Sequence, residues 1–222
     1  MVMVSKCILI ITVGAILVTP CFADNENAFD DDVFIDNFSS SHLDGRVDNA
    51  NRGQWIYRDN VATAVCDPEL YVEHHNHGPI LSWPVTFKEG HVEFEMKATD
   101  CQRVVFTLNG DGHIFRVTLA DETDACKAGA SRVPTRLIAW ETKSSKQNKG
   151  DTIKPEGLPH LPAIQDQWVR LSLDIRGENA VLAIGDFEHR VQHAAFVRDK
   201  SAITLTFAHG KLAVRNYRMS VR

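Results

Sequence analysis

Apolar and polar side chains alternate along much of this chain. In the stretch GHVEFEMKA, residues 90–98, the apolar side chains occupy every second position and histidine, glutamate and lysine fill the positions between. The same alternation recurs in residues 103–108, 168–175 and 201–208. Successive side chains of a β-strand point to opposite faces, so this pattern is typical of strands with one buried face. No segment shows the sustained period of about 3.6 residues that indicates an amphipathic helix.

Turn-forming residues separate these alternating stretches. Glycine, asparagine and aspartate accumulate between apolar runs at residues 88–90, 109–112, 176–179, 185–186 and 209–211. Many short strands joined by such turns, in a chain long enough for one domain, predict an all-β antiparallel sandwich or barrel. We expect one face of each sheet to pack inward and the other to remain in water.

The first 23 residues are typical of a signal peptide. Lys6 precedes an apolar run that ends at Val18, and a small residue, Ala23, stands at the expected cleavage site. The run is shorter than the roughly 20 residues of a membrane-spanning helix. We therefore expect a secreted or periplasmic protein with no membrane span after cleavage. Residues 24–32 would form an acidic tail, and residues 33–222 a single domain.

Charge and cysteine content narrow the function classes. The formal net charge is −5, without basic clusters, which argues against nucleic acid as a partner. Beyond the signal peptide the chain has three cysteines, Cys66, Cys101 and Cys126. Export permits disulfides, but the sequence leaves open whether two of these cysteines pair or none do.

A long polar segment interrupts the pattern. Residues 142–164 are rich in lysine and contain Pro155, Pro159 and Pro162. A connection of this length is either a mobile surface loop or one that lines a binding site.

Several stretches resemble one group of secreted bacterial proteins. Residues 33–64 contain an apolar-Asp-x-Phe start followed by a Gly-x-Trp strand. GHIFRVTL, residues 112–119, resembles a Gly-His-Ile-x-Arg-Val strand, and the C-terminal part has a Trp-led strand, a glycine hairpin and a Lys200-Ser201 step. Over most of residues 31–222 the chain is similar to the 3-keto-disaccharide hydrolase domain proteins. The resemblance implies a concanavalin A-like jelly-roll sandwich of two curved antiparallel sheets, with glycans handled on the concave side.

Hydrolysis of a glycosidic bond usually requires two carboxylates that flank it. The Glu-x-Asp-x-x-Glu strand of the sandwich proteins that cleave glucans is absent here. The nearest stretch holds Glu93 and Glu95 on one polar strand face, followed by Lys97. These residues form either a carboxylate pair in a groove or an ordinary solvated strand face.

The stretch that carries the family resemblance supplies further candidates. Strict alternation places His113 and Arg116 on opposite faces, although the glycines on both sides of Asp111 would let Asp111 or His113 approach a groove. Arg116 could hold a carboxylate or a sugar hydroxyl through two hydrogen bonds. Alternatively, it forms a cross-strand ion pair with Glu93 or Glu95.

Two tryptophans are candidate platforms for a sugar ring. Trp55 and Trp140 each lie in an apolar strand. An aromatic face packs well on the C–H groups of a pyranose, but burial in the core is the commoner place for tryptophan in an all-β domain.

The stretch EHHNHGP, residues 73–79, contains three histidines. In an extended segment His75 and His77 would share a face, and His74 would point away. A zinc site would need further ligands from another strand. The other interpretations are a polar loop that enters a strand, or His77 acting alone as a hydrogen-bond partner or general base. The resemblance favours His77, and we predict no metal here.

Together these features predict an exported jelly-roll protein that binds or cleaves a saccharide. The candidate catalytic residues are Glu93, Glu95, His77 and His113, and the candidate substrate-binding residues are Arg116, Trp140, Trp55, Lys97 and Asp111. We expect a monomer without cofactors, and a structural calcium ion bound by Asp36 and backbone carbonyls remains open. The alternatives are a non-catalytic carbohydrate-binding module and a structural or interaction domain of the cell surface.

Overall fold

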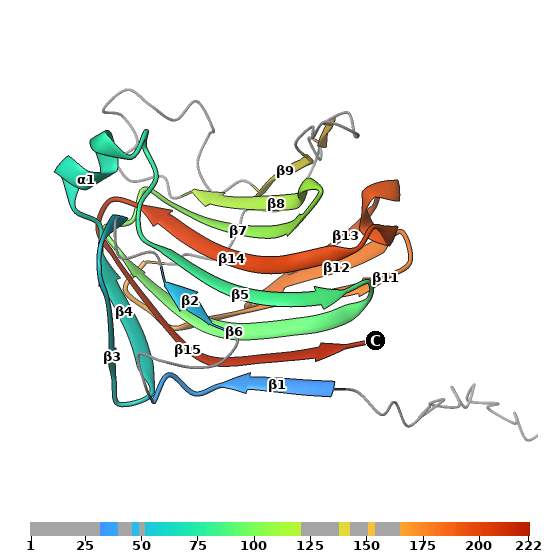
Figure 1. The fold of residues 1–222 in the computed structure, drawn as a ribbon, viewed down its shortest axis with the longest axis horizontal. Coiled ribbons are helices and arrows are strands. Elements are labelled where there is room, and N and C mark those ends of the chain that lie inside the picture. Colours follow the sequence, from blue (N-terminus) through green and yellow to red (C-terminus); the bar gives the residue numbers. More distant parts are fainter. Residues whose placement is uncertain (1–31, 40–45, 49–51, 121–137, 143–150, 154–164) are drawn as a thin grey trace, which may run out of the picture. The chain divides into compact units, whose positions relative to one another are not determined.

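The computed structural model describes residues 32–39, 46–48, 52–120, 138–142, 151–153 and 165–222 (Figure 1). The predicted signal peptide, nearly all of the acidic tail, Cys126 and most of the 142–164 loop lie outside these ranges.

Two antiparallel sheets make up the described fold. The first sheet has the strand order β13 (Phe187–Gln192), β12 (Asn179–Ile184), β11 (Val169–Arg176), β6 (Gly90–Thr99), β15 (Lys211–Val221), β4 (Val61–Val65) and β3 (Trp55–Arg58), and β1 (Asp32–Asp36) also pairs with β15. The second sheet has the order β10 (Asp151–Ile153), β9 (Ile138–Thr142), β8 (Gly112–Ala120), β7 (Arg103–Gly110), β14 (Lys200–Ala208), β5 (Ile80–Phe87) and β2 (Val47–Asp48). Several long strands curve visibly, among them β5, β6 and β14 (Figure 1). The prediction of an all-β fold with two curved antiparallel sheets is confirmed.

The alternation of the sequence determines which side chains fill the space between the sheets. On β6, Phe94 and its apolar neighbours are buried, and on β7 the same is true of Phe106. The rings of Phe94 and Phe106 stack with centroids 5.9 Å apart, and so join the inner faces of the two sheets. Side chains at the alternate positions of each strand therefore point to the outer faces. Glu93 and Glu95 lie on the outer face of the first sheet, and Arg103 lies on that of the second.

A buried polar network joins the sheets near one edge. Asp36, with 0 % of its surface exposed, accepts a hydrogen bond of 3.1 Å from Nε1 of Trp83 on β5. The same carboxylate forms an ion pair with Arg46 and accepts a hydrogen bond of 2.9 Å from the backbone N–H of Phe38. The guanidinium of Arg46 stacks over Tyr57, 4.2 Å from the ring centroid. The Asp36 carboxylate thus joins Arg46, Trp83 and the backbone of Phe38 in the interior.

A second buried charge, on Lys200, stabilises the start of β14. Lys200 is fully buried, and its Nζ donates hydrogen bonds to the backbone carbonyls of Phe196, Arg198 and Lys88. Phe196 and its neighbours form a short 3₁₀ helix, η3 (Ala194–Val197), and Lys200 holds the chain where this helix leads into β14.

A short helix, α1 (Pro68–Glu73), precedes β5 and was not predicted. The side chain of Asp67 caps it by accepting hydrogen bonds from the backbone N–H groups of Glu69 and Leu70, at 2.8 and 3.1 Å. Aspartate followed by proline is a common start of a helix, and this was the missed signal. Within the described ranges, no helix is long and apolar enough to cross a membrane.

A β-bulge in β8 shifts the phase of its alternation. Leu108 on β7 pairs with Phe115, but the next residue, Asn109, pairs with His113, so Ile114 is an extra residue in β8. Ile114 and Phe115 are both fully buried, and His113 and Arg116 on either side of them are half-buried. The bulge therefore places His113 and Arg116 on the same outer face, and the expectation of opposite faces is wrong.

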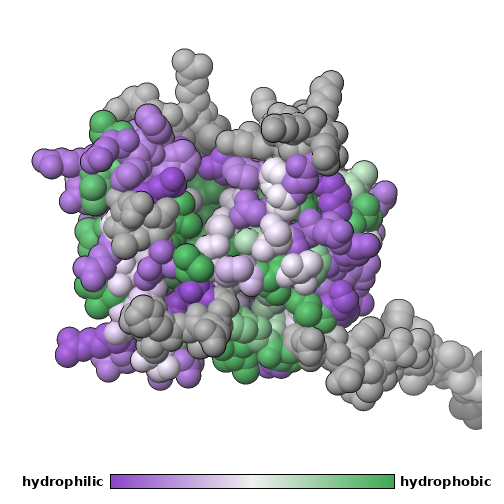
Figure 2. Space-filling view, in the orientation of Figure 1, coloured by the Kyte–Doolittle hydropathy of each residue, from purple (hydrophilic) through white to green (hydrophobic). Residues whose placement is uncertain are grey.

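The two described cysteines are buried, whereas several apolar side chains are exposed. Cys66 and Cys101 are buried free thiols. Exposed apolar side chains include Val33 and Ile35 of β1, and apolar residues gather over β1 in the space-filling view (Figure 2). The surface around α1 is mostly hydrophilic in the same view.

Candidate functional site

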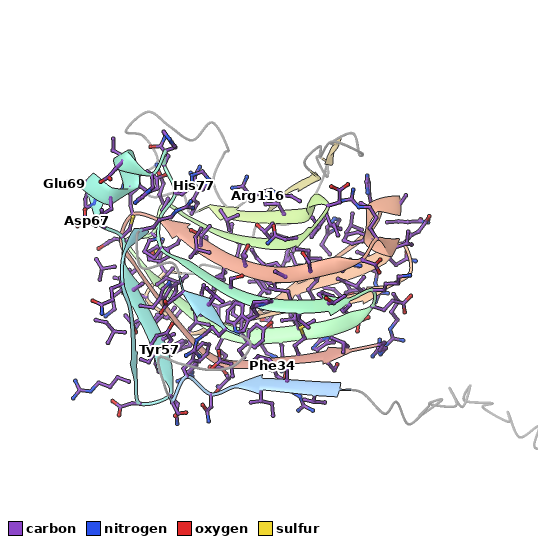
Figure 3. All side chains as sticks on the ribbon, viewed as in Figure 1. Phe34, Tyr57, Asp67, Glu69, His77 and Arg116 are labelled. Atoms are coloured by element: carbon purple, nitrogen blue, oxygen red, sulfur yellow. The ribbon has the colours of Figure 1, made fainter. Side chains whose placement is uncertain are left out.

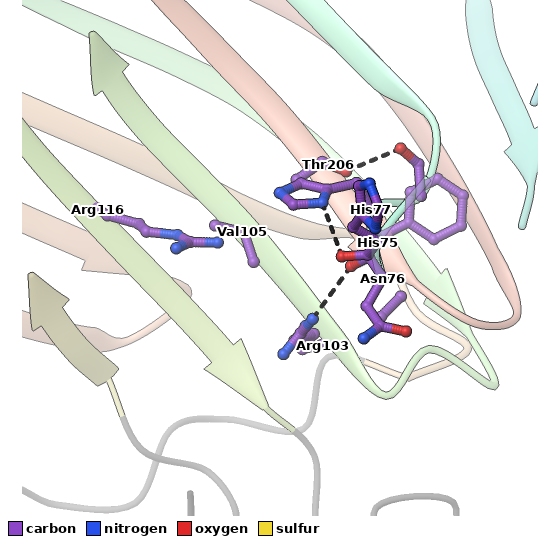
Figure 4. A pocket seen from close by; sticks show the side chains of 10 residues that line it. His75, Asn76, His77, Arg103, Val105, Arg116 and Thr206 are labelled. Carbon is purple, nitrogen blue, oxygen red and sulfur yellow. Dashed lines mark hydrogen bonds between the residues drawn. The ribbon is translucent and has the colours of Figure 1, made fainter. Parts of the chain in front are cut away.

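A pocket of about 220 Å³ opens on the outer face of the second sheet (Figure 4). The turn after α1 and strands β7, β8 and β14 form its walls. Its lining consists of His75, Asn76, His77, Gly78, Arg103, Val105, Arg116, Thr206, Phe207 and Ala208. Of the candidates from the sequence, His77 and Arg116 therefore lie at one site, and both are on the same side of the sheet in Figure 3.

The turn after α1 brings its histidines over this sheet face. The backbone N–H of His74 still bonds to the carbonyl of Leu70, and Asn76 then donates 2.8 Å to the carbonyl of Tyr71. His75 and Asn76 adopt left-handed backbone conformations, with φ of 56° and 64°. The segment is thus a tight turn and not an extended strand end, so the expectation that His75 and His77 share a strand face is wrong.

His77 has a fixed ring orientation. Its Nδ1 lies 3.1 Å from the carbonyl oxygen of His74 and 3.0 Å from that of His75. Carbonyl oxygens only accept hydrogen bonds, so Nδ1 carries the proton, and Nε2 of the neutral ring is an acceptor. Figure 4 shows this second nitrogen directed across the pocket, on the side of Arg116.

Two arginines on neighbouring strands flank Val105 in the pocket (Figure 4). Arg103 of β7 is held by hydrogen bonds from Nη2 to the hydroxyl of Tyr71, at 3.0 Å, and to the carbonyl of Asn76, at 3.5 Å. Arg116 is on β8, where it pairs with Thr107 of β7. Tyr71 is buried, so the helix that carries it positions the Arg103 guanidinium.

The lining is cationic and polar. Beside the two arginines it contains two histidines, and the hydroxyl of Thr206 donates a hydrogen bond of 3.4 Å to the carbonyl of Gly78. None of the described lining residues is an aspartate or glutamate. Such a site can donate hydrogen bonds to hydroxyl or oxyanion groups, accept one at His77, and offer apolar contact at Val105.

The predicted carboxylate pair lies elsewhere. Glu93 and Glu95 are on the outer face of the first sheet, whereas His77 and Arg116 are on the outer face of the second. Glu93 forms an ion pair with Arg170, and Glu95 accepts a 2.5 Å hydrogen bond from Nε of Arg215. The proposed ion pair between Arg116 and either glutamate is therefore wrong, and so is a common groove for all four predicted catalytic residues.

The pairing of Glu93 also affects its ionisation. Burial opposes the charged form, but hydrogen bonds from Arg170 and His91 outweigh burial and hold the pKa of Glu93 below its ordinary value. A general acid for glycoside cleavage needs a raised pKa, so Glu93 does not have the properties of one.

The remaining polar candidates are also dispersed. Lys97 lies on β6 of the first sheet, on the same face as Glu93. Asp111 is at the tip of the β7–β8 hairpin, and His113 pairs with Asn109 beside that tip. The pocket is at the opposite end of β7, where Arg103 begins the strand. The hairpin thus separates Asp111 and His113 from the pocket along the strand.

The tryptophan candidates have different outcomes. Trp55 is only 3 % exposed and packs edge-to-face on Phe207, with centroids 6.1 Å apart, so it is a core residue and the prediction of a sugar platform is wrong. The backbone of Trp140 pairs with Val117 and Ile153, but its side chain lies outside the described part. Trp168 is half-buried beneath the guanidinium of Arg215.

Sequence reasoning missed Arg103, Asn76 and Thr206. Arg103 and Thr206 occupy outward positions of alternating strands, and the sequence showed this much. Their proximity to His77 depends on β14 lying beside both β5 and β7, which a local pattern does not reveal.

Within the described ranges, no group of three or more histidine, cysteine or acidic side chains could hold a metal ion.

The comparison with solved structures supports the architecture. No family model matches the sequence, and no curated protein matches it. Carbohydrate-binding module CBM66 from Bacillus subtilis matches with a TM-score of 0.51 at 8 % identity, over 78 % of this chain and 94 % of that one. The fold is a concanavalin A-like jelly-roll sandwich.

Two further solved structures were also matched, with TM-scores below 0.5. A tetrameric galectin from the ball sponge Cinachyrella sp. matches with a TM-score of 0.48 at 15 % identity, over 63 % of this chain and 99 % of that one. The homodimeric agglutinin CG-16 from chicken liver matches with a TM-score of 0.47 at 10 % identity, over 64 % of this chain and 99 % of that one. The resemblance to 3-keto-disaccharide hydrolase domain proteins stays a prediction from sequence.

Proposed function

We propose that this protein is an exported, non-catalytic saccharide-binding module whose ligand occupies the pocket between the α1 turn and strands β7, β8 and β14. The observation that carries the proposal is the lining itself. Arg103, Arg116 and His77 come from three separate segments and line one pocket without a described carboxylate.

This lining suits the chemistry of a sugar. Sugar hydroxyls both donate and accept hydrogen bonds, and the arginine N–H groups and the Nε2 atom of His77 supply the matching partners. Val105 offers an apolar surface for sugar C–H groups. The likeness to a carbohydrate-binding module supports the proposal at the level of the fold.

Binding has more support than cleavage. A glycosidase normally places two carboxylates on either side of the scissile bond, about 5 to 10 Å apart. Glu93 and Glu95 lie on the other sheet and are each paired with an arginine. The hydrolase hypothesis consequently rests on the sequence resemblance, and the pocket supplies no described acid for it.

A glycan array followed by calorimetry tests the proposal. We expect the mature protein to bind at least one class of saccharide, and His77→Ala and Thr206→Val to weaken that binding. Arg170→Ala is the matched control, because Arg170 lies on the outer face of the first sheet. Binding that survives both pocket substitutions, or no binding to any glycan on the array, would contradict the proposal.

Activity assays separate binding from catalysis. The protein is incubated with disaccharides and 3-keto-disaccharides, and monosaccharide release is measured. We expect no release from the wild-type protein. Release that disappears in Glu93→Gln or Glu95→Gln would establish the hydrolase instead.

Export is part of the proposal and has its own test. The protein is expressed with its full N-terminal segment in a bacterial host, and its N-terminus is sequenced after fractionation. We expect a mature chain that begins at Asp24, outside the cytoplasm. Retention of residues 1–23 in the cytoplasmic fraction would overturn this point alone.

A further inference from the structure

We infer that the outer face of the first sheet binds a linear acidic polysaccharide, whose carboxylate or sulfate groups pair with a row of basic side chains on β15. This basic row consists of Lys211, Arg215 and Arg218. The pocket opens on the outer face of the second sheet, so the basic row is a separate binding surface that goes beyond the proposed function.

A β-bulge in β15 brings the arginines of the row onto one face. Arg215 pairs with Glu95 of β6 and Arg218 pairs with Glu93, so two residues of β15 oppose one residue of β6 between these pairs. Asn216, at the bulge, has a left-handed φ of 56°. Strict alternation would turn Arg218 to the interior, whereas with the bulge it is exposed on the same face as Arg215.

Basic side chains outnumber acidic ones on this face. No aspartate or glutamate occurs in β15. The outward positions of β6, β11 and β15 hold six basic and three acidic side chains: Lys97, Arg170, Arg176, Lys211, Arg215 and Arg218 against Glu93, Glu95 and Asp174. The whole chain has the opposite balance, with a formal net charge of −5. A positive face on an acidic protein attracts anions to that face.

The acids on this face already have arginine partners. The ion pairs are Glu93 with Arg170, Glu95 with Arg215, and Asp174 with Arg176. Three cations remain that form no ion pair with any described residue: Lys97, Lys211 and Arg218. Because Lys211 and Arg218 are exposed, an incoming oxyanion reaches them without displacing a carboxylate.

The spacing of the row fits a polymer better than a small anion. Lys211 and Arg218 are seven residues apart, about 20 Å along the strand, so one carboxylate or sulfate group does not contact both. A linear polymer with repeated charges meets the basic side chains in turn. The overall acidity of the chain disfavours nucleic acid, whose binding depends on many basic contacts to phosphates.

Apolar side chains beside the row suit a sugar. Ile35 of β1 pairs with Arg218, Val33 pairs with Ser220, and both apolar side chains are exposed. Apolar residues gather over β1 in Figure 2. A sugar ring carries both C–H groups for this surface and oxyanions for the arginine, whereas an inorganic anion has no use for the apolar contacts.

Two pairs of polymers test the requirement for negative charge. Dextran sulfate is compared with dextran, and polygalacturonate with its methyl-esterified form, by calorimetry with the protein. We expect the charged member of at least one pair to bind about tenfold or more tightly than its neutral partner. The preference should shrink as salt rises, because screening weakens the ionic contacts. The pair that shows the preference identifies the sulfate or the carboxylate.

A double variant localises the binding. Lys211→Gln with Arg218→Gln removes two cations of the row without leaving a carboxylate unpaired, and should weaken binding of the charged polymer about tenfold. Arg58→Gln with Lys88→Gln is the matched control, because it removes the same charge at exposed positions outside the row. We expect the control to change the affinity by less than about twofold. Circular dichroism confirms that both variants are folded.

The contrary outcomes are distinct. Equal affinity for charged and neutral polymers would overturn the inference, and so would equal losses in the two double variants, which would indicate net charge alone. Sedimentation of the protein with anionic phospholipid vesicles, but binding to neither charged polymer, would assign the face to a membrane instead.

Failure of this inference is distinguishable from failure of the proposed function. Neutral saccharides carry no charge for the basic row, so their binding and its loss in His77→Ala report on the pocket. Binding of the charged polymer should be unchanged in His77→Ala. Its loss there, with full binding in the Lys211→Gln and Arg218→Gln double variant, would move the anion site to the pocket and overturn the inference.

Discussion

Asp36 and Trp83 are joined by a buried hydrogen bond that links the two sheets, with 3.1 Å between Nε1 of Trp83 and Oδ2 of Asp36. Asp36 ends β1 in the first sheet and Trp83 lies in β5 of the second. The ring of Trp83 stacks at 4.0 Å on Tyr217 of β15. This contact links the first sheet to β5, the strand that follows the pocket turn.

Replacing Asp36 should destabilise the domain strongly. Asp36→Ala leaves Arg46 without its carboxylate and Trp83 without its acceptor, both in the buried interior. Breaking a buried ion pair costs about 3 to 5 kcal/mol of unfolding free energy. Urea unfolding followed by tryptophan fluorescence measures this change. Asp199→Ala, which removes an exposed carboxylate 3.8 Å from Lys88, is the control and should cost less than about 1 kcal/mol. Equal losses for the two variants would contradict the assigned role.

His91 should make stability depend on pH. Hydrogen bonds to Asp174 and Glu93 raise the pKa of His91 above its ordinary value of 6.5, against the opposing effect of burial. Stability from the charged imidazole is therefore fully present below about pH 6.5 and is lost as pH rises through the folded pKa. The pKa of Asp174 and that of Glu93 are held below 3.8 and 4.5, so their contributions are lost only at lower pH.

The window for this cluster is therefore about pH 4.5 to 6.5. We expect His91→Asn to reduce the free energy of unfolding more at pH 5.5 than at pH 8.5. Chemical denaturation of both proteins at the two pH values gives the comparison, and the coupling with Asp174→Asn should follow the same trend. A loss that is the same at both pH values would show that the ionic contacts of His91 do not contribute.

Lys200 should be required for the junction between η3 and β14. Burial lowers the pKa of Lys200 to about 8, so at neutral pH the ammonium still has three N–H groups for three backbone carbonyls. Lys200→Met removes these donors, and unsatisfied buried carbonyls should cost at least about 2 kcal/mol. Lys88→Met, at an exposed position, should change the free energy of unfolding by about 0.5 kcal/mol or less. Thermal and urea unfolding at pH 7 provide the measurement. An unchanged free energy of unfolding in Lys200→Met would refute the prediction.

Gly78→Ala should damage both stability and binding. A Cβ atom at Gly78 would lie 2.0 Å from the carbonyl oxygen of Phe207, so the turn that carries His77 would have to move. We expect a loss of about 1 to 3 kcal/mol, as for other overpacked sites, and weaker ligand binding in calorimetry. Gly177→Ala is the control: its Cβ meets no atom within 4 Å, and its φ of 54° costs about 1 kcal/mol. An unchanged ligand affinity in Gly78→Ala would show that this turn does not contribute to the binding site.

The sequence predicted the architecture better than the site. Alternation identified the inward-facing residues of β6, β7, β11 and β14. Burial on one face imposes a period of two on each strand separately, so the pattern can be read from each stretch alone. The partition of Glu93 and Arg116 between opposite outer faces depends on which strands are neighbours. That is a property of the whole topology, and no local stretch records it.

Two local features also escaped the pattern. The α1 helix is six residues long, too short for a helical period to appear, and only the Asp67-Pro68 pair signals it. The left-handed turn at His75 and Asn76 is invisible to any rule that assumes an extended backbone. Both errors concern the segment that positions His77, which is why the pocket was predicted only in part.

The bulge at Ile114 means that β8 consists of two segments with independent phases. Deleting Ile114 would restore strict alternation and leave His113 and Arg116 on the outer face, whereas pairing the same residues without a bulge would turn His113 to the interior. The extra residue thus lets two side chains that are three positions apart in the sequence share the outer face of one strand. Chains that share this fold can therefore keep the same residues on β8 and present different surfaces, according to whether the pairing with β7 includes the bulge.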